Sequence, residues 1–249
     1  MRRSPLGPVS TFLREAAAST RSPRANRRLA VLLALTAGML NSVGFVAVGV
    51  YTSHMSGQVA SAADHLVSGS WNVVGVAGAA LGSFVLGAAV CAVVFNWGRR
   101  RHREARYANV LALEAVLIVV IAASAGRFAD GYRVWVDIPL LCLTMGMQNA
   151  IVTKISNAQI RTTHVTGMVT DIGIELGKLA YRNRTPGLPP VTGDPDRLRL
   201  HLTVVGGFLL GGVLGASGYL ALGFDCLLAP AVVLAAAAAP PILADRRPR

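Results

Sequence analysis

Stretches of about 20 residues with almost no charge recur along nearly the whole of this 249-residue chain. A helix needs about 20 consecutive apolar residues to cross the hydrocarbon core of a bilayer. Only 14% of the residues are charged and 53% are apolar, whereas roughly a quarter of the residues in a soluble domain are charged. We therefore expect an all-α polytopic membrane protein, with little chain left over for an aqueous core.

Six apolar segments are long enough to cross the membrane, and we expect six transmembrane helices at 30–50, 73–95, 108–125, 135–152, 202–221 and 224–244. Together they form one membrane domain over residues 30–244. Residues 1–29 are rich in Arg, Ser and Pro and are predicted to be a basic, disordered tail, and residues 245–249 form a second short tail.

The segments outside the spans are alternately rich and poor in Lys and Arg along the chain. The first, third, fifth and seventh segments outside the spans hold 22 Lys and Arg residues, and the three segments between them hold 2. The positive-inside rule then places both termini in the cytoplasm. A net charge of +12 would suggest nucleic acid as a partner of a soluble chain, but these basic residues flank apolar segments without interleaved aromatics. The expected partner is the lipid bilayer, and no nucleic acid is expected.

One motif occurs twice, about 110 residues apart. Gly-Met-x-Asn is followed by Thr-[Ser/Thr]-His-x-[Ser/Thr]-Gly, first at 38–41 and 52–57, then at 146–149 and 162–167. Each copy closes the first span of its half, so the halves 30–125 and 135–244 are repeats of three spans. An odd number of spans makes the second copy enter the membrane from the opposite side, which is the parity of inverted-repeat transporters.

Helical periodicity resumes after the Gly of each motif, so each motif is expected to lie at a helix break. Ser56 and Thr166 are placed to cap the helix that follows, and the free N–H groups there could receive an anionic or polar group. Irregular backbone within a membrane must line protein or a water-filled cavity. The alternative is that hydroxyls and Gly serve only caps and turns, with the histidines exposed at the interface.

Polar residues near the two breaks are the candidate ligands for a small solute or ion. Two asparagines lie inside spans and must find partners, and Arg161 either binds an anion or marks the cytoplasmic side. Asp171 and Glu175 share a polar row with Lys178, which is either part of a site or the solvated face of an interfacial helix. The candidates are Asn41, Thr52, His54, Ser56, Asn149, Arg161, Thr162, His164, Thr166, Asp171 and Glu175.

Glu114 is a further candidate because it lies about six residues inside the third span. A carboxylate at that depth is costly and usually faces the interior of the bundle. Two interpretations remain open, namely coupling of transport to protons or cations and pairing with a basic residue near the inner interface.

These motifs, in this order, resemble the YoaK family of bacterial membrane proteins, also called the family of domain of unknown function 1275. The resemblance covers about residues 30–243, and its most specific parts are 51–58 and 146–175. It implies a bacterial inner-membrane protein with six spans and does not indicate a substrate.

Three functions compete on this evidence. The leading one is a small secondary transporter or permease whose central polar cavity is lined by the two motifs. The alternative is a membrane scaffold or assembly factor that does not transport. An enzyme is not expected: the two motif histidines start on opposite sides, no His-x3-His or Cys-x2-Cys pair occurs, and no cofactor or metal is predicted. An oligomer is possible.

The charge pattern predicts the orientation of the chain. A reporter that is active only in the cytoplasm should be active when fused after Arg249 or Arg103 and silent when fused after Ser68. Activity after Ser68 would contradict this topology and the inverted pairing of the motifs.

Overall fold

The computed structural model describes residues 23–101, 105–125, 127, 130–155, 165–183 and 187–245. Within this part of the chain all regular secondary structure is helical. The elements are α2 (Pro23–Val48), α3 (Met55–Val67), α4 (Trp71–Arg100), α5 (Arg106–Ser124), α6 (Asp130–Ile155), α7 (Val165–Ala180), α8 (Pro195–Leu222), η1 (Gly223–Leu227) and α9 (Leu228–Asp245).

Five segments are long and apolar enough to cross a membrane: Arg27–Val48, Trp71–Arg100, Arg106–Ser124, Tyr132–Lys154 and Pro195–Asp245. The last has 51 residues and contains α8, η1 and α9. At 1.5 Å per residue it is far longer than the roughly 30 Å that one crossing requires. The chain is thus a multi-pass membrane protein by the length and composition of its helices. The first helix begins at Pro23, earlier than the span expected from residue 30.

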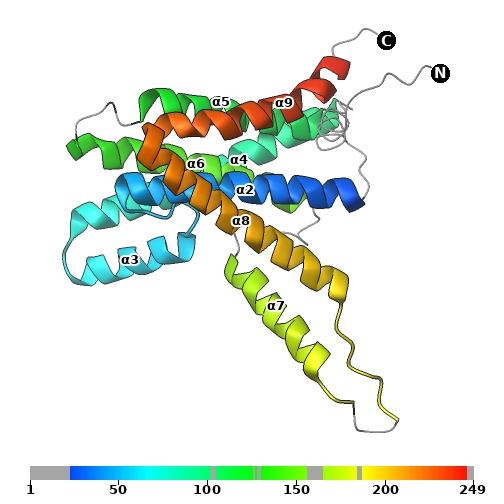
Figure 1. The fold of residues 1–249 in the computed structure, drawn as a ribbon. Coiled ribbons are helices and arrows are strands. Elements are labelled where there is room, and N and C mark those ends of the chain that lie inside the picture. Colours follow the sequence, from blue (N-terminus) through cyan, green and yellow to red (C-terminus); the bar gives the residue numbers. More distant parts are fainter. Residues whose placement is uncertain are drawn as a thin grey trace.

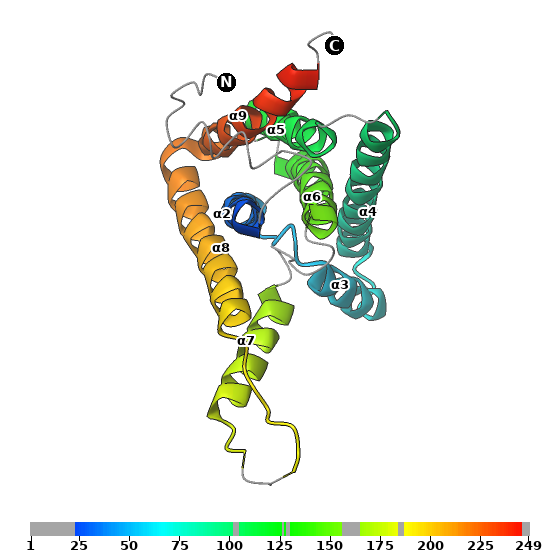
Figure 2. The same cartoon turned by 90° about the vertical axis from the view of Figure 1, so that its right-hand side faces the viewer.

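The bundle is arranged around two central helices, α2 and α6, with α8 on one side, α4 on the other, and α5 and α9 above (Figure 2). The closest helix pairs are α2 with α8, α4 with α6, and α5 with α9. Each of these pairs joins one half of the chain to the other, so the core is shared between the halves.

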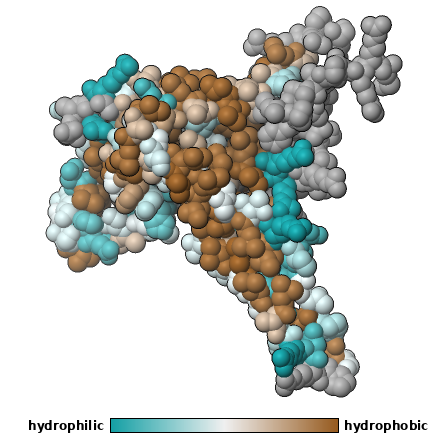
Figure 3. All heavy atoms as spheres, viewed as in Figure 1, coloured by the Kyte–Doolittle hydropathy of each residue, from teal (hydrophilic) through white to brown (hydrophobic). Residues whose placement is uncertain are grey.

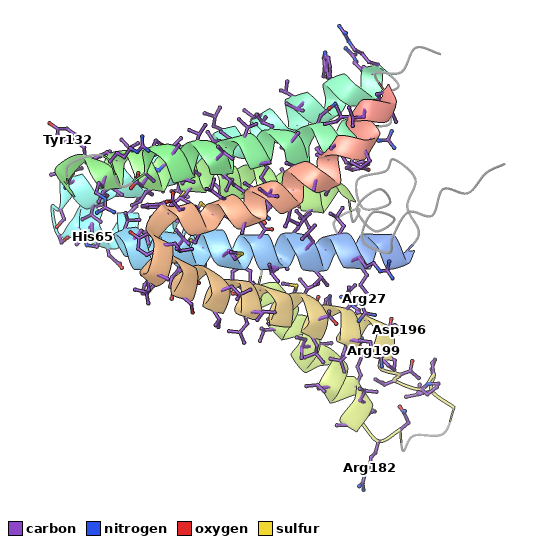
Figure 4. All side chains as sticks on the ribbon, turned by 45° about the horizontal axis from the view of Figure 1, so that its top comes forward. Arg27, His65, Tyr132, Arg182, Asp196 and Arg199 are labelled. Carbon is purple, nitrogen blue, oxygen red and sulfur yellow. The ribbon has the colours of Figure 1, made fainter. Side chains whose placement is uncertain are left out.

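The apolar surface forms a band between two polar ends. Figure 3 shows brown surface over α8 and α9 in the middle of the molecule and teal patches towards its left and right edges. Figure 4 places Arg27, Arg182 and Arg199 towards one end and His65 and Tyr132 at the other. This is the distribution of a protein whose helices run along the membrane normal.

Glycines permit the close approach of α2 to α8. A methyl group on Gly38 would overlap the carbonyl oxygen of Phe208, and one on Gly211 would overlap the carbonyl oxygen of Leu35. Small residues at helix interfaces let the backbones approach until they touch, which favours association within lipid. Gly207, Gly211 and Gly215, which are spaced four residues apart in the fifth predicted span, are all buried and therefore serve helix packing.

The same contacts recur between α6 and α4. A methyl group on Gly146 would overlap the carbonyl oxygen of Phe84, and one on Gly87 would overlap that of Leu143. The segments 32–41 and 140–149 share the pattern Leu-Leu-x-Leu-Thr-x-Gly-Met-x-Asn, and 82–87 and 206–211 share Gly-x-Phe-x-Leu-Gly. Equivalent residues of the two halves thus make equivalent contacts with exchanged partners.

The two short helices start near the middle of the molecule in Figure 1 and run towards opposite ends, α3 to the left and α7 to the lower right. The chain turns back after α2 at Gly49, which adopts a positive φ of 73° that favours glycine. On the other half, Asp194 caps α8 by accepting from the backbone N–H groups of Asp196 and Arg197, both at 3.0 Å, ahead of Pro195 at the first helical position.

Enlarging the contact glycines should destabilise the bundle. Gly87→Ala and Gly211→Ala place a methyl group against backbone, and we expect each to lower the free energy of unfolding by about 1–3 kcal/mol. Thermal unfolding in detergent measures the effect.

Gly82→Ala and Gly206→Ala are matched controls on the same two helices, because a methyl group there meets no atom within 4 Å. Alanine is also the better helix former, so these variants should be neutral or slightly more stable. Equal destabilisation of all four variants would contradict the packing that we describe.

Candidate binding site

The first motif is held in place by Asn41 of α2. The Asn41 side chain is 7% exposed, and its Oδ1 accepts hydrogen bonds from the backbone N–H and the hydroxyl of Ser53, both at 3.0 Å. The expectation that this asparagine finds partners is confirmed. Tyr51 at the start of the motif stacks on Phe45, with ring centroids 4.4 Å apart.

Thr52 and His54 of the first motif each contact a glycine. Thr52 is fully buried against Gly44, and its Oγ1 has no hydrogen-bond partner among the described residues. His54 is exposed, and its ring folds over the first turn of α3, where a methyl group on Gly57 would overlap it. The spacing of His54 and Gly57 in the first copy therefore has a steric reason.

The predicted capping role of Ser56 is wrong. The N-cap of α3 is His54, no side chain accepts from the first turn, and Ser56 is exposed at the second residue of the helix. The reason is that the helix starts at Met55, so that Ser56 lies within the first turn and not at the N-cap. The N–H groups of this first turn thus remain free of side-chain caps.

The second motif is described only in part. Arg161, Thr162 and His164 lie outside the described residues. Asn149 is half-buried in α6, and its carbonyl oxygen accepts a hydrogen bond from the Thr153 hydroxyl at 2.8 Å.

Thr166 is exposed at the second residue of α7, the position that Ser56 has in α3. Its carbonyl oxygen accepts from the Thr170 hydroxyl at 2.9 Å. Two further small residues follow on the same face of α7, Gly173 and Gly177, and both face open space. This face of α7 therefore carries small and polar residues and faces open space at both glycines.

The predicted polar row on α7 joins α8 in what we term the α7–α8 polar cluster, formed by Asp171, Glu175, Lys178, Arg197 and His201. Glu175 is 2% exposed and accepts from Lys178 Nζ at 2.9 Å and from the backbone N–H of Asp194 at 2.8 Å. Asp171 accepts from the Arg197 guanidinium at 3.2 Å and lies 3.9 Å from His201 Nε2. The interpretation of Glu175 as part of a solvated face is therefore wrong, since α8 covers it.

No sequence pattern predicted the α8 members of this cluster. Arg197 and His201 lie one turn apart on α8, and only the packing of α7 shows that they face Asp171. Gln148 was also missed. It is fully buried in α6 and donates from Nε2 to the carbonyl oxygen of Leu33 in α2, at 2.9 Å. Comparison of the repeats would have found it, because Leu40 takes its place in the first copy.

Glu114 is fully buried within α5, and neither of its carboxyl oxygens has a hydrogen-bond partner in the described part of the chain. Among the described elements, α5, which carries Glu114, does not pack on α3, which follows the first motif. The structure thus separates three polar regions: the first motif, the α7–α8 polar cluster and Glu114.

An apolar groove of about 520 Å³ lies between α5 and α9, with Ala115, Val119, Ala235 and Ala239 among its walls. No group of three His, Cys, Asp or Glu side chains comes together within the described ranges to hold a metal ion. The three cysteines, Cys91, Cys142 and Cys226, are buried and free.

Residues 29–239 match the family described as "Protein of unknown function (DUF1275)". The chain belongs to this family. No curated protein and no solved structure matches it. This assignment confirms the predicted resemblance to the family of domain of unknown function 1275.

The contacts of Glu175 predict how the α7–α8 polar cluster responds to pH. The backbone N–H of Asp194, followed by the Lys178 ammonium, holds the pKa of the Glu175 carboxyl below its ordinary value. The ionised group therefore stabilises the contact at every pH above about 4.3, the ordinary pKa of Glu, and this contribution is lost as the pH falls through the lowered value.

We expect Glu175→Gln to loosen α7 from α8 at neutral pH, and the difference from the wild type should vanish in acid. The distance between spin labels on α7 and α8 would measure it. Asp225→Asn is the control, because Asp225 is an exposed carboxylate in η1. A contact that is unchanged in Glu175→Gln would contradict the role given to this carboxylate.

Proposed function

We propose that this protein is a small secondary transporter of the bacterial inner membrane, built from two inverted repeats of three spans. Its cargo is a small solute or ion, and no catalytic step, cofactor or metal is assigned to it. The partner is the bilayer, and assembly into an oligomer is compatible with the proposal.

The exchange of equivalent contacts between the halves carries this proposal. Gly38 meets Phe208 as Gly146 meets Phe84, and α5 pairs with its counterpart α9. Such exchange is what a two-fold axis between α2 and α6 requires. With three spans in each half, the axis lies in the membrane plane and the halves have opposite orientations.

Six crossings follow if α8 and α9 each cross the membrane. They belong to one apolar segment of 51 residues, and η1 joins them at Gly223, where φ is 61°. The start of α2 and the end of α9 then lie on the same side of the membrane. The start of α5 also lies there, because the backbone N–H of Ala105 donates to the carboxylate of Asp245 at the end of α9, at 3.0 Å. The basic tails and connections make this side the cytoplasmic one.

The binding region is proposed to lie between the starting points of α3 and α7. Both are short helices that begin near mid-depth and end at opposite faces (Figure 1), as the half-helices of inverted-repeat transporters do. The free N–H groups at such helix starts favour an anionic or polar ligand. The proposed ligands are the side chains of the two motifs, Thr52, His54, Ser56, Thr162, His164 and Thr166, with Asn41, Asn149 and Arg161 beside them.

The two halves differ in one respect that a transporter would use. In Figure 2, α3 lies alongside α4, whereas α7 extends away from the bundle and its main contact is with α8. Apolar side chains on α7 are about half exposed, among them Val169, Ile174 and Leu176. A conformation in which α7 docks and α3 swings out would exchange the roles of the two halves, and alternation between the two states would open the binding region to each side in turn.

Reciprocal accessibility tests this proposal. In a background with Cys91, Cys142 and Cys226 replaced by Ala, we expect Ser56→Cys and Thr166→Cys to react with a membrane-impermeant thiol reagent in opposite proportions as conditions shift the equilibrium. Val67→Cys and Tyr181→Cys are controls, because both positions are exposed at the far ends of α3 and α7 and should react steadily from their own sides.

Steady reaction at Ser56→Cys and Thr166→Cys would contradict alternating access and favour a scaffold. Ligand screening adds a second measurement. A substrate that binds the folded protein raises its melting temperature in a concentration-dependent way, and His54→Ala should weaken that shift while leaving expression nearly unchanged.

A further inference from the structure

The apolar groove between α5 and α9 has a floor of small side chains and rims of larger ones. Ala115, Ala231 and Ala238 form the floor, and each of them is at most 4% exposed. Val232 and Leu243 belong to the rims and are more than half exposed. All twelve residues that line the groove are apolar, so its walls offer no polar side chain to a ligand.

The groove is too narrow for a helix. It follows α9 from Ala231 to Leu243, which is about 18 Å at 1.5 Å per residue. A volume of about 520 Å³ over that length leaves a mean cross-section of about 29 Å², or a width of about 6 Å. A helix with its side chains is about 10–12 Å across, whereas an extended hydrocarbon chain is one methylene group wide. The groove therefore has the dimensions of an acyl chain.

An apolar groove by itself does not select one lipid. Lipid tails are as apolar as the side chains of the groove, so a chain that moves from the bilayer into the groove gains packing contacts but little hydrophobic free energy. Every phospholipid in the membrane has such a chain. Selectivity must therefore come from the side chains that the headgroup meets at the end of the groove.

The end of the groove at Leu243 lies beside the basic start of α5. Two residues further along α9, the Asp245 carboxylate accepts from the backbone N–H of Ala105 at 3.0 Å. The next residue is Arg106, in the first turn of α5, and its guanidinium lies over the ring of Tyr107. A positive charge is thus placed where the groove reaches the end of the helix pair.

The end of α4 adds further positive charge at the same place. A methyl group on Gly98 would lie 3.1 Å from the Arg106 Cα, so α4 ends beside the start of α5. Residues 99–101 are three exposed arginines, and the Arg101 guanidinium lies 5.0 Å from the centroid of the Trp97 ring. Tryptophan together with basic side chains is typical of the headgroup level of a membrane.

The two ends of the groove differ in charge. At the arginine end, the Asp245 carboxylate is bound to the backbone of Ala105. At the other end, η1 contributes the exposed Asp225 and Arg127 follows α5, so both signs are present there. The arginine end is therefore the one that favours an anionic group.

We propose that the α5–α9 groove is a binding site for an anionic phospholipid. One acyl chain lies between the rims of the groove, and the phosphate lies beside Arg106 and the arginines at the end of α4. Basic pockets between transmembrane helices on the cytoplasmic side bind anionic headgroups in this way. Only the choice of the cytoplasmic leaflet rests on the topology proposed above, and the site does not require transport.

Native mass spectrometry of the purified protein tests the headgroup. Dioleoyl phosphatidylglycerol and dioleoyl phosphatidylcholine have the same chains and differ in net charge, and we expect the first to bind about tenfold more tightly or better. Arg106→Gln should weaken phosphatidylglycerol about fivefold, the contribution of one arginine at a membrane surface, and leave phosphatidylcholine unchanged. Arg127→Gln, at the other end of α5, is the control and should change neither. If Arg106→Gln fails to fold, Arg100→Gln serves instead, because Arg100 is exposed.

A matched pair of variants on α9 tests the groove. Ala235→Leu places a larger side chain in the groove, whereas Ala236→Leu adds the same side chain at the next residue, which is exposed outside the groove. We expect Ala235→Leu to weaken phosphatidylglycerol about fivefold or more and Ala236→Leu to have no effect. Ala235 is itself exposed, so the substitution leaves the core of the bundle intact.

Four results would overturn the proposal. They are equal binding of the two lipids, no effect of the arginine variants, equal effects of Ala235→Leu and Ala236→Leu, and binding of glycerol 3-phosphate as tight as that of phosphatidylglycerol, because the groove would then contribute nothing. A dimer that Ala235→Leu abolishes and Ala236→Leu preserves would also overturn it, since the groove would then be an interface between two copies of the chain.

Discussion

The close backbone contact between α2 and α8, repeated between α6 and α4, is the constraint on which the rest of the structure depends. Gly38 and Gly211 remove the side chains that would separate α2 from α8, and Gly146 and Gly87 do the same for α6 and α4. Within lipid, where apolar burial provides no net driving force between helices, contact of this kind is a main source of association.

These contacts exchange partners between the halves of the chain. The first helix of each half packs on the second long helix of the other, α2 on α8 and α6 on α4, so neither half can form its core alone. The two central helices also carry equivalent threonines, Thr36 and Thr144, whose hydroxyls donate to the carbonyl oxygens of Leu32 and Leu140 within their own helices. A buried hydroxyl can be satisfied in this way without a partner on another helix, which leaves the glycine contact undisturbed.

The same frame explains why the short helices are free to differ. α3 and α7 take no part in the contacts that α2, α4, α6 and α8 make with one another. Each packs mainly on one of these helices, α3 on α4 and α7 on α8. Asn41 fixes the start of α3 through Ser53, whereas a network of charges fixes α7 to α8. In the transporter that we propose, such a core with two peripheral short helices would let a change of state move the helices at the proposed binding region and leave the core intact.

Sequence alone determined the class of protein, the positions of the long helices and the existence of the repeat, because apolar length, charge alternation and repeated motifs are local properties. It also identified Glu114, since a carboxylate inside an apolar span is conspicuous. It misplaced the start of α3: the asparagine that binds Ser53 lies 12 residues earlier, and no local capping rule includes that contact.

Only the tertiary structure decided which polar residues meet. Arg197 and His201, which lie near Glu175 and Asp171 respectively, come from another helix. The place of Lys154 over the Phe95 ring likewise depends on how α6 packs on α4. Helical periodicity shows which residues share a face, but the partner of that face is set by steric fit between distant segments. In this protein that fit is made by glycines whose contacts lie more than 50 residues away in the chain, beyond the reach of any local pattern.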